Sequence, residues 1–370
     1  MSYFDVSNIK RECIISGTSD IIITENGEAV LCKSSDNSKF MTSNIFAARI
    51  AEYAPQLHSY FVDIGDSRRA MLGSMSGGEE ASYRSGDFCL VQVTSAPRDK
   101  KGAYVSDKIR LTGIYTVLLP CEKKAAVNIS AKIKNKEERE RLSMIGESLE
   151  SQYSIIMRTE AAGASAGLIA EDHKRLTREW KDILQIYKEK KSNGSCGSIR
   201  LRDPLVCEIM KYPASSYSEI CADTPDMMEY IKRALPQLSD KLKFIPKRIF
   251  AVKSVDNVKS ALLGKKVYLK SGADIVIEKT EALTVIDVNT GGSKLSYKDV
   301  NKEAAREIMR QLRLRDIGGM VVCDFIEMNN ENDKQELTEY MRRLAYIDPS
   351  KPEIFGLTAL GLMEITRKRS

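Results

Sequence analysis

Two carboxylates and one carboxamide lie where apolar segments of the sequence end, and together they could hold a metal ion. In TEALTVIDVNTGG (280–292), Asp287 and Asn289 are two residues apart, at the end of an apolar run that leads into a glycine turn. Side chains two residues apart in a strand share one face, so we expect both to point the same way. Asp324 lies in a second apolar run, MVVCDFIEM.

The segment between these runs determines whether the two acids can meet. KEAAREIMRQLRLRD has apolar residues at helical spacing, and the IGG that follows suits a glycine C-cap. We therefore expect strand 283–289, helix 303–315 and strand 320–328 to form a strand–helix–strand unit with parallel strands and a right-handed crossover. Asp287 would then lie at a strand's C-terminal end, where sites gather in open α/β sheets, close to Asp324.

Two converging carboxylates repel each other unless positive charge lies between them. A hard cation with oxygen ligands suits the pair, and Mg²⁺ suits it best, while Asn289 could orient a carboxylate or a metal-bound water. Mg²⁺ would activate a water and neutralise charge on a phosphodiester. The alternative is that an aspartate at a strand end caps a helix or forms a turn, and the pattern alone leaves this open.

Histidine and cysteine usage narrows the chemistry. The chain has two histidines, His58 and His173, so a triad built on histidine is poorly supported. His173 lies in the charge-rich stretch EDHKRLTREWK and is expected at the surface. None of the eight cysteines forms C-x-x-C, which argues against a structural zinc site.

Charge and hydropathy bound the class of protein. The net charge of +6, from 57 basic and 51 acidic residues, is compatible with a nucleic-acid partner. No apolar run approaches the roughly 20 residues of a membrane span, and the N-terminus lacks a signal-peptide pattern. We expect a cytoplasmic protein without a membrane segment.

The order of predicted elements indicates several subdomains. Short strands separated by Gly, Ser and Asp turns favour a small barrel between about residues 45 and 112. A mixed region with one long helix follows, and KSNGSCGS (191–198) is the best linker candidate. PLVCEIMKYP is expected to be a strand, and the last third is α/β.

Several sequence blocks resemble the ribonuclease E/G family. Over roughly ninety residues, TEALTVIDVNTG, EAAREIMRQLRLRDIGGMVVCDFIEM and GLMEITRKR resemble its catalytic region in order and spacing. FVDIGDSRRAMLGS resembles its S1-type RNA-binding barrel. KGAYVSDKIRLTGIYTVLLP, NISAKI and IIMRTEAAGAS resemble the segment that senses the 5′ end of RNA.

The resemblance implies an α/β chain in which two subdomains are inserted into a third. An S1-type OB-fold barrel and a 5′-sensor would interrupt an RNase H-like subdomain, and a DNase I-like α/β catalytic subdomain would follow. The implied boundaries are 1–41 with 198–258 for the RNase H-like subdomain, 42–107 for the barrel, 108–197 for the sensor and 259–370 for the catalytic subdomain.

The resemblance also implies an activity. The chain would be a Mg²⁺-dependent endoribonuclease that cleaves single-stranded RNA in RNA processing or decay, leaving 5′-phosphate and 3′-hydroxyl ends. Asp287 and Asp324 match the family's metal-binding aspartates, with Asn289 as the supporting carboxamide, which agrees with the reading of these residues above.

A pocket for a 5′-monophosphate is implied by four further matches. A guanidinium, a hydroxyl and a backbone amide are suitable groups for a terminal phosphate, although from the pattern alone Arg158 would be an ordinary strand-end arginine. The matching residues are Gly113, Val117, Arg158 and Thr159.

Two matches on the barrel imply contacts with RNA. Phe61 matches an aromatic on which a base can stack, and Lys101 matches a lysine that contacts the RNA backbone. Each has a plain alternative: Phe61 as a core residue of YFVDIG, and Lys101 as a solvated loop charge.

The chain also departs from the family's pattern at RNA-contacting positions. Met71 replaces a second barrel aromatic. SAKI leaves Lys132 but has Ala131 in place of an arginine. Lys351 stands where the family has an arginine, so it keeps the charge but loses the bidentate fork.

The remaining expectations concern assembly and rival functions. The sequence stops at Ser370 before the cysteine pair through which family subunits share zinc and before the small domain that follows it, so a monomer or a zinc-independent dimer is expected rather than a zinc-linked dimer or tetramer. One rival is a catalytically weak RNA-binding regulator on the same scaffold. Another is a phosphosugar or nucleotide hydrolase, which would need a closed small-ligand pocket.

Overall fold

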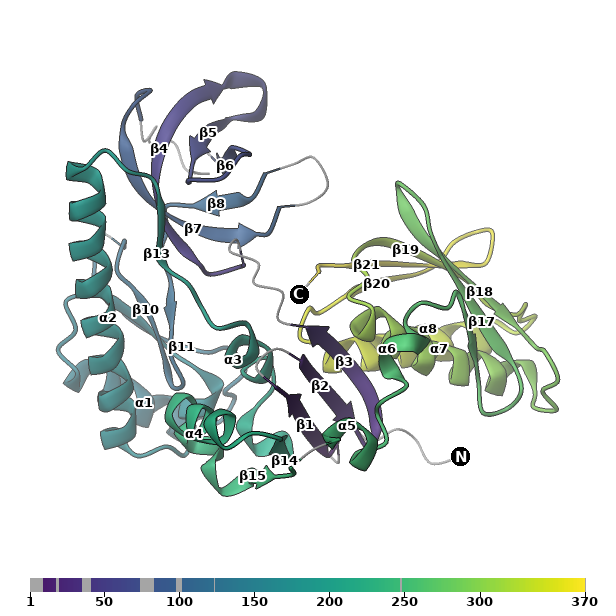
Figure 1. Ribbon diagram of the computed structural model, residues 1–370. Coiled ribbons are helices and arrows are strands. Elements are labelled where there is room, and N and C mark those ends of the chain that lie inside the picture. Colours follow the sequence, from purple (N-terminus) through teal and green to yellow (C-terminus); the bar gives the residue numbers. More distant parts are fainter. Residues whose placement is uncertain are drawn as a thin grey trace. The chain divides into compact units, whose positions relative to one another are not determined.

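The computed structural model describes residues 9–369 except 18–19, 35–40, 74–82, 98–101, 123 and 247 (Figure 1). The chain divides into two compact units. Met1–Asp36 and Leu205–Ser370 form the first, which we call the split unit, and Asn37–Pro204 form the second, which we call the inserted unit. No helix in the described ranges has both the length and the apolar character needed to span a bilayer.

The C-terminal part of the split unit contains a mixed sheet, which we call the C-terminal sheet. In spatial order its strands are β16 (Lys266–Tyr268), β17 (Asp274–Lys279), β18 (Leu283–Asn289), β19 (Gly319–Asp324), β21 (Leu362–Arg367) and β20 (Glu353–Leu357). β18 and β19 are parallel and the other neighbours antiparallel. The expected parallel strand–helix–strand unit is confirmed, with α7 (Tyr297–Leu314) as the crossover helix and α8 (Glu331–Ile347) following β19.

The helix α7 begins six residues earlier than its apolar pattern predicts. Ser296 is its N-cap, because the side-chain oxygen accepts a hydrogen bond from the Asp299 amide at 3.2 Å. The inner face is the one the spacing predicts, with Ala304, Ala305, Ile308, Met309 and Leu312 all buried. These residues pack in one core with the inward side chains of β18 and β19.

A second sheet of the split unit joins strands from both ends of the chain. In spatial order its strands are β15 (Leu242–Phe244), β14 (Tyr217–Ala222), β1 (Arg11–Ser16), β2 (Asp20–Glu25) and β3 (Glu28–Ser34). β1 pairs in parallel with β14, which follows the inserted unit in the sequence. The accompanying helices are α3 (Pro204–Ile209), α4 (Pro225–Ala234), α5 (Ile249–Val252) and α6 (Val258–Ala261).

The expected strand at PLVCEIMKYP is wrong, because residues 204–209 form α3. Leu205 and Ile209 are both buried at a spacing of four, which is the helical repeat.

A buried ion pair fixes α7 to β2 within the split unit. Arg313 donates two hydrogen bonds to the Glu25 carboxylate, at 2.9 and 2.8 Å, and Arg11 donates a third at 2.9 Å. Burial alone would raise the pKa of Glu25, but the two guanidinium groups outweigh it and lower that pKa. The charged network therefore ties the second sheet to the crossover helix.

The inserted unit begins with a closed barrel consistent with an OB-fold. Its strands are β4 (Ile45–Ala54), β5 (Ser59–Asp63), β6 (Ala70–Gly73), β7 (Phe88–Ser95) and β8 (Tyr104–Ser106). Pairing of β4 with β7 closes the barrel. β13 (Gly197–Arg200) also pairs with β4, in antiparallel fashion.

The rest of the inserted unit is a small sheet packed on two helices. The strands in order are β11 (Val127–Ile129), β12 (Ser154–Met157), β10 (Thr116–Leu119) and β9 (Leu111–Thr112), and the helices are α1 (Lys136–Ser148) and α2 (Ala166–Ser192). Leu118 and Ile155 of the sheet share a core with Leu176 and Trp180 of α2.

Candidate functional site

Asp287 and Asp324 lie side by side on the C-terminal sheet. They are direct partners in the parallel register of β18 and β19. Neighbouring strands are about 4.8 Å apart, and residues in parallel register project to the same face. That face is open to solvent, because Asp287, Asp324, Val285 and Met320 are exposed. Ile286 and its cross-strand partner Cys323 point to the opposite face and are buried.

Asn289 is tied to Asp287 by a hydrogen bond. Its Nδ2 lies 2.9 Å from Asp287 Oδ2 and 3.5 Å from Asp274 Oδ2. Asp274 is 4% exposed and forms an ion pair with Lys266 at 3.0 Å. Because the amide nitrogen faces two carboxylates, the Asn289 carbonyl oxygen is left as an acceptor. Sequence reasoning did not single out Asp274, because its role depends on its antiparallel pairing with Asn289.

The donor set fits a hydrated hard cation. Within the described residues Asp324 has no hydrogen-bond or ion-pair partner, and Asp287 receives a hydrogen bond from Asn289 alone. The same residues contain no group of three or more His, Cys, Asp and Glu side chains that could enclose a metal. Mg²⁺ commonly binds through one or two carboxylates and keeps several waters, so a pair of aligned aspartates suits it. Asp287 and Asp324 are exposed and Asn289 is half-buried, because the sheet is covered on one face only.

The residues matched to the 5′-phosphate pocket gather at one end of the small sheet. Arg158 follows β12, and its Nη1 donates to the carbonyl oxygens of Gly113 and Ile114, the latter at 2.9 Å. Val117 of β10 is paired with Ile156, two residues before Arg158.

Thr159 and Lys132 belong to the same neighbourhood. The Thr159 hydroxyl lies 3.3 Å from that of Ser130, and the Lys132 amide donates to the Ser130 hydroxyl at 3.4 Å. The Lys132 side chain is exposed. Ser130 thus links the segment that carries Lys132 to the one that carries Thr159, which directly follows Arg158 in the chain.

Asp172 of α2 holds the turn that precedes β10. Its carboxylate accepts hydrogen bonds from the amides of Ile114, Tyr115 and Thr116 at 3.1, 2.9 and 3.0 Å, and Arg175 donates at 2.8 Å. Burial alone would raise the pKa of Asp172, but these hydrogen bonds outweigh it and lower that pKa.

The same carboxylate explains the glycine at position 113. A Cβ on Gly113 would lie 2.4 Å from a carboxylate oxygen of Asp172, so a side chain there is excluded by space. The sequence carried no signal for this contact, because Asp172 stands in a charged helical stretch and its partners are 56 to 58 residues away.

Phe61 and Met71 lie on neighbouring strands of the barrel. Phe61 is half-buried, lies outside the barrel core and pairs across the strands with Met71. Met71 pairs in turn with Tyr104, which is 42% exposed. Tyr104 was missed by sequence reasoning because only the strand register places it in this row. Lys101 lies outside the described residues.

The structure also places Lys351 and His173. Lys351 is exposed in the turn after α8, where its amide donates to the Asp348 carbonyl at 2.9 Å. The surface position expected for His173 is wrong: it is 7% exposed. It lies on the inward stripe of α2 with Ile169, Leu176 and Trp180.

Comparisons with known proteins identify relatives of this chain. The sequence model of the Ribonuclease E/G family matches residues 110–370. Ribonuclease G of Escherichia coli (strain K12) is 30% identical over 363 residues, covering 89% of this chain and 73% of that protein. Ribonuclease E of Nostoc sp. is 32% identical over 356 residues, which is 88% of this chain and 51% of that protein, and Ribonuclease E of Synechocystis sp. is 30% identical over 354 residues. The chain therefore belongs to the ribonuclease E/G family.

Proposed function

We propose that this chain is a Mg²⁺-dependent endoribonuclease that cleaves single-stranded RNA in RNA processing and leaves 5′-phosphate and 3′-hydroxyl ends. Family membership supports an endoribonuclease. The observation that carries the mechanism is the register of Asp287 with Asp324 on an exposed sheet face.

Each residue of the open face has a defined role in this proposal. Asp287 and Asp324 would hold Mg²⁺, and Asn289 keeps Asp287 oriented through its 2.9 Å hydrogen bond. When bound, Mg²⁺ supplies an activated water and neutralises charge on the phosphodiester. The face is exposed, so a long strand can cross it, which disfavours the closed-pocket hydrolase.

We extend the proposal to the RNA's 5′ end. Gly113, Val117, Arg158 and Thr159 would bind a 5′-monophosphate, with Lys132 adding charge beside the Thr159–Ser130 contact. The Arg158 guanidinium is already steadied by the two carbonyls it donates to and by an ion pair with Glu160 at 3.5 Å. Phe61 would stack a base, and Lys101 and Lys351 would contact the RNA backbone. The implied subdomain boundaries and their RNase H-like and DNase I-like folds belong to this proposal.

Replacing either aspartate tests the metal site. Asp287→Asn and Asp324→Asn should each reduce cleavage of a single-stranded oligonucleotide by about 100-fold or more, because each removes a charged ligand of the cation. Binding of the same oligonucleotide in EDTA should be unchanged. Glu278→Gln is the matched control, since Glu278 is an exposed carboxylate of the same sheet, paired with Lys265.

Two outcomes would contradict the proposal. Full cleavage by both aspartate variants would exclude this site. Wild-type protein that binds RNA but produces no Mg²⁺-dependent ends would leave the RNA-binding regulator as the function.

Replacing Arg158 tests the 5′ pocket. Arg158→Ala should reduce the preference for 5′-monophosphorylated over 5′-hydroxyl RNA, measured as the ratio of the two kcat/KM values, because a charge-assisted bond to the phosphate is lost. An equal fall on both substrates would argue that Arg158 supports the fold and does not sense the 5′ end.

A further inference from the structure

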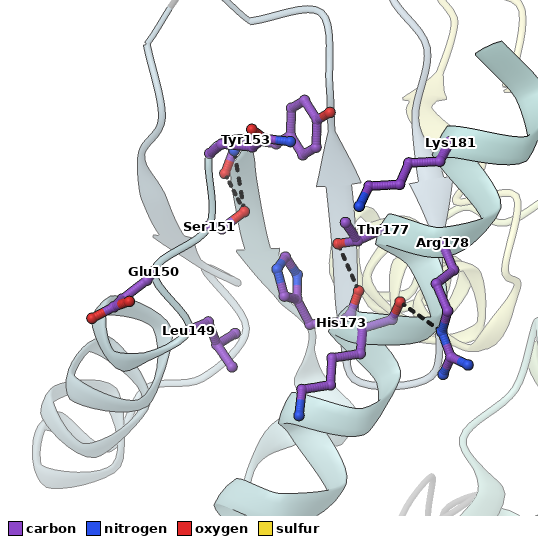
Figure 2. Close-up of a pocket in the computed structure, with 10 residues that line it drawn as sticks. Leu149, Glu150, Ser151, Tyr153, His173, Thr177, Arg178 and Lys181 are labelled. Atoms are coloured by element: carbon purple, nitrogen blue, oxygen red, sulfur yellow. Dashed lines mark hydrogen bonds between the residues drawn. The ribbon is translucent and has the colours of Figure 1, made fainter. Parts of the chain in front are cut away.

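A cavity of about 480 Å³ lies in the inserted unit between α2 and the loop 149–153 that follows α1 (Figure 2). It contains none of the residues matched to the 5′-phosphate pocket. Its volume falls in the range of small-ligand sites, about 300–1,000 Å³. The wall includes Tyr153, His173 and Leu149, so much of it is apolar or aromatic.

Three cations of α2 border this cavity. Lys174, Arg178 and Lys181 follow one another at spacings of four and three, which places them on one stripe of the helix. All three are exposed, and none has an acidic partner within 4 Å in the described part of the chain. The neighbouring Arg175, in contrast, is paired with Asp172 and Glu179.

The acidic residue of the lining does not neutralise this stripe. Glu150 directs its carboxylate away from His173 and Lys181, whereas Lys181 extends from α2 toward the loop that carries Tyr153 (Figure 2). The cavity therefore combines an aromatic wall with uncompensated positive charge.

His173 adds an unusual polar atom to the wall. The residue is only 7% exposed, and its Nδ1 has no hydrogen-bond partner in the described structure. Buried polar atoms without a partner are rare in native proteins and call for a bound group or water.

We propose that this cavity binds a nucleotide, with its phosphate at Lys174, Arg178 and Lys181 and its base against Tyr153 and His173. Aromatic rings stack on bases and cations pair with the phosphate, which is the usual chemistry of single-strand recognition. The nucleotide can be part of the RNA substrate, in which case the site rests on the proposed function, or a free mononucleotide. The two experiments below distinguish these sources.

The two histidines of the chain give a direct readout of binding. In protein labelled with ¹⁵N at histidine, adenosine 3′-monophosphate, which carries no 5′-phosphate for the pocket at Arg158, should shift the ring resonances of His173 in a saturable way. Those of His58, which ends the short helix Pro55–Leu57 on the barrel, should stay in place. No shift of His173 at millimolar nucleotide, or equal drift of both histidines, would overturn the proposal.

The RNA arm uses two matched double variants of α2. Lys174→Ala/Lys181→Ala removes two charges from the cavity, and Lys188→Ala/Lys191→Ala removes two from the same helix outside it. Affinity for a 5′-hydroxyl single strand is measured in EDTA, so that neither cleavage nor the 5′ pocket contributes.

If RNA occupies the cavity, the first variant should bind about 3- to 10-fold more weakly than the second. The slope of log affinity against log salt concentration should also become shallower by about 1.4, because each lost phosphate contact removes about 0.7 from it. A nucleotide-dependent shift of His173 with equal RNA affinity of the two variants would support the free mononucleotide. Absence of the His173 shift in protein that still binds RNA would overturn the cavity proposal alone, and wild-type protein that binds no RNA would contradict the proposed function.

Discussion

The open face of the C-terminal sheet and the turn at Gly113 use carboxylates in opposite ways. Asp172 is 5% exposed and accepts hydrogen bonds from three backbone amides and from Arg175. Asp324 is exposed and has no partner in the described part of the chain, although Asp287 is its direct neighbour.

This difference separates structural charge from charge kept for a ligand. Hydrogen bonds to a buried carboxylate stabilise the fold, because removing either side leaves a desolvated group without a partner. Two adjacent carboxylates without a cation instead repel each other, and their negative charge is available to an ion. The turn is already organised internally, whereas the open face is completed by binding.

The largest expected effect contrasts the two acids directly. Asp172→Ala should lower the free energy of unfolding by about 3 kcal/mol, because five donors, the Thr116 hydroxyl among them, lose their buried acceptor. Asp324→Ala should change it by no more than about 0.5 kcal/mol, since an exposed side chain without partners is removed. Urea unfolding of both variants measures this, and equal losses would abolish the distinction.

Ligand-linked stability provides a second test. Mg²⁺ at about 100 times its Kd should stabilise the wild-type fold by about 2.7 kcal/mol. This Mg²⁺-dependent stabilisation should be absent in Asp287→Asn. It should be intact in Glu278→Gln and in Asp172→Asn, each compared with the same variant without metal. Thermal unfolding with and without Mg²⁺ measures it, and a gain retained by Asp287→Asn would place the ion elsewhere.

Acid should act on the turn with a smaller effect. The pKa of Asp172 is lower in the folded chain than its unfolded value of about 3.9. Its stabilisation is therefore complete above that value and is lost as the pH falls through the folded pKa. Unfolding midpoints measured from pH 6 to pH 3 should decline more steeply for the wild type than for Asp172→Asn. Parallel declines would show that other carboxylates dominate.

The parts of the fold that sequence reasoning predicted were those with strong local periodicity. The strand expected at 283–289 has those bounds in the structure, because its inward side chains alternate with outward ones. The inner face of α7 was predicted because Ala304, Ile308 and Leu312 recur at helical spacing. The short run at 204–209 misled, since a few apolar residues fit either a strand or a helix.

Some residues of the candidate site could likewise be predicted from the sequence, and others could not. Asp287 and Asp324 could be proposed from sequence because one crossover helix places two strand ends together. Asp172, Asp274 and Tyr104 could not, because each depends on pairing that no local pattern records. His173 was misjudged because charged neighbours concealed its place on the buried stripe of α2.

The parallel pairing of β1 with β14 also has a consequence for biosynthesis. The two strands are about 200 residues apart in sequence, with the inserted unit between them. At about 5–20 residues per second, a ribosome needs on the order of 10–40 seconds to make that stretch. During this interval β1 lacks its parallel partner β14, while the inserted unit can already fold. On the nascent chain, the inserted unit is thus expected to fold before the sheet that contains β1 is complete.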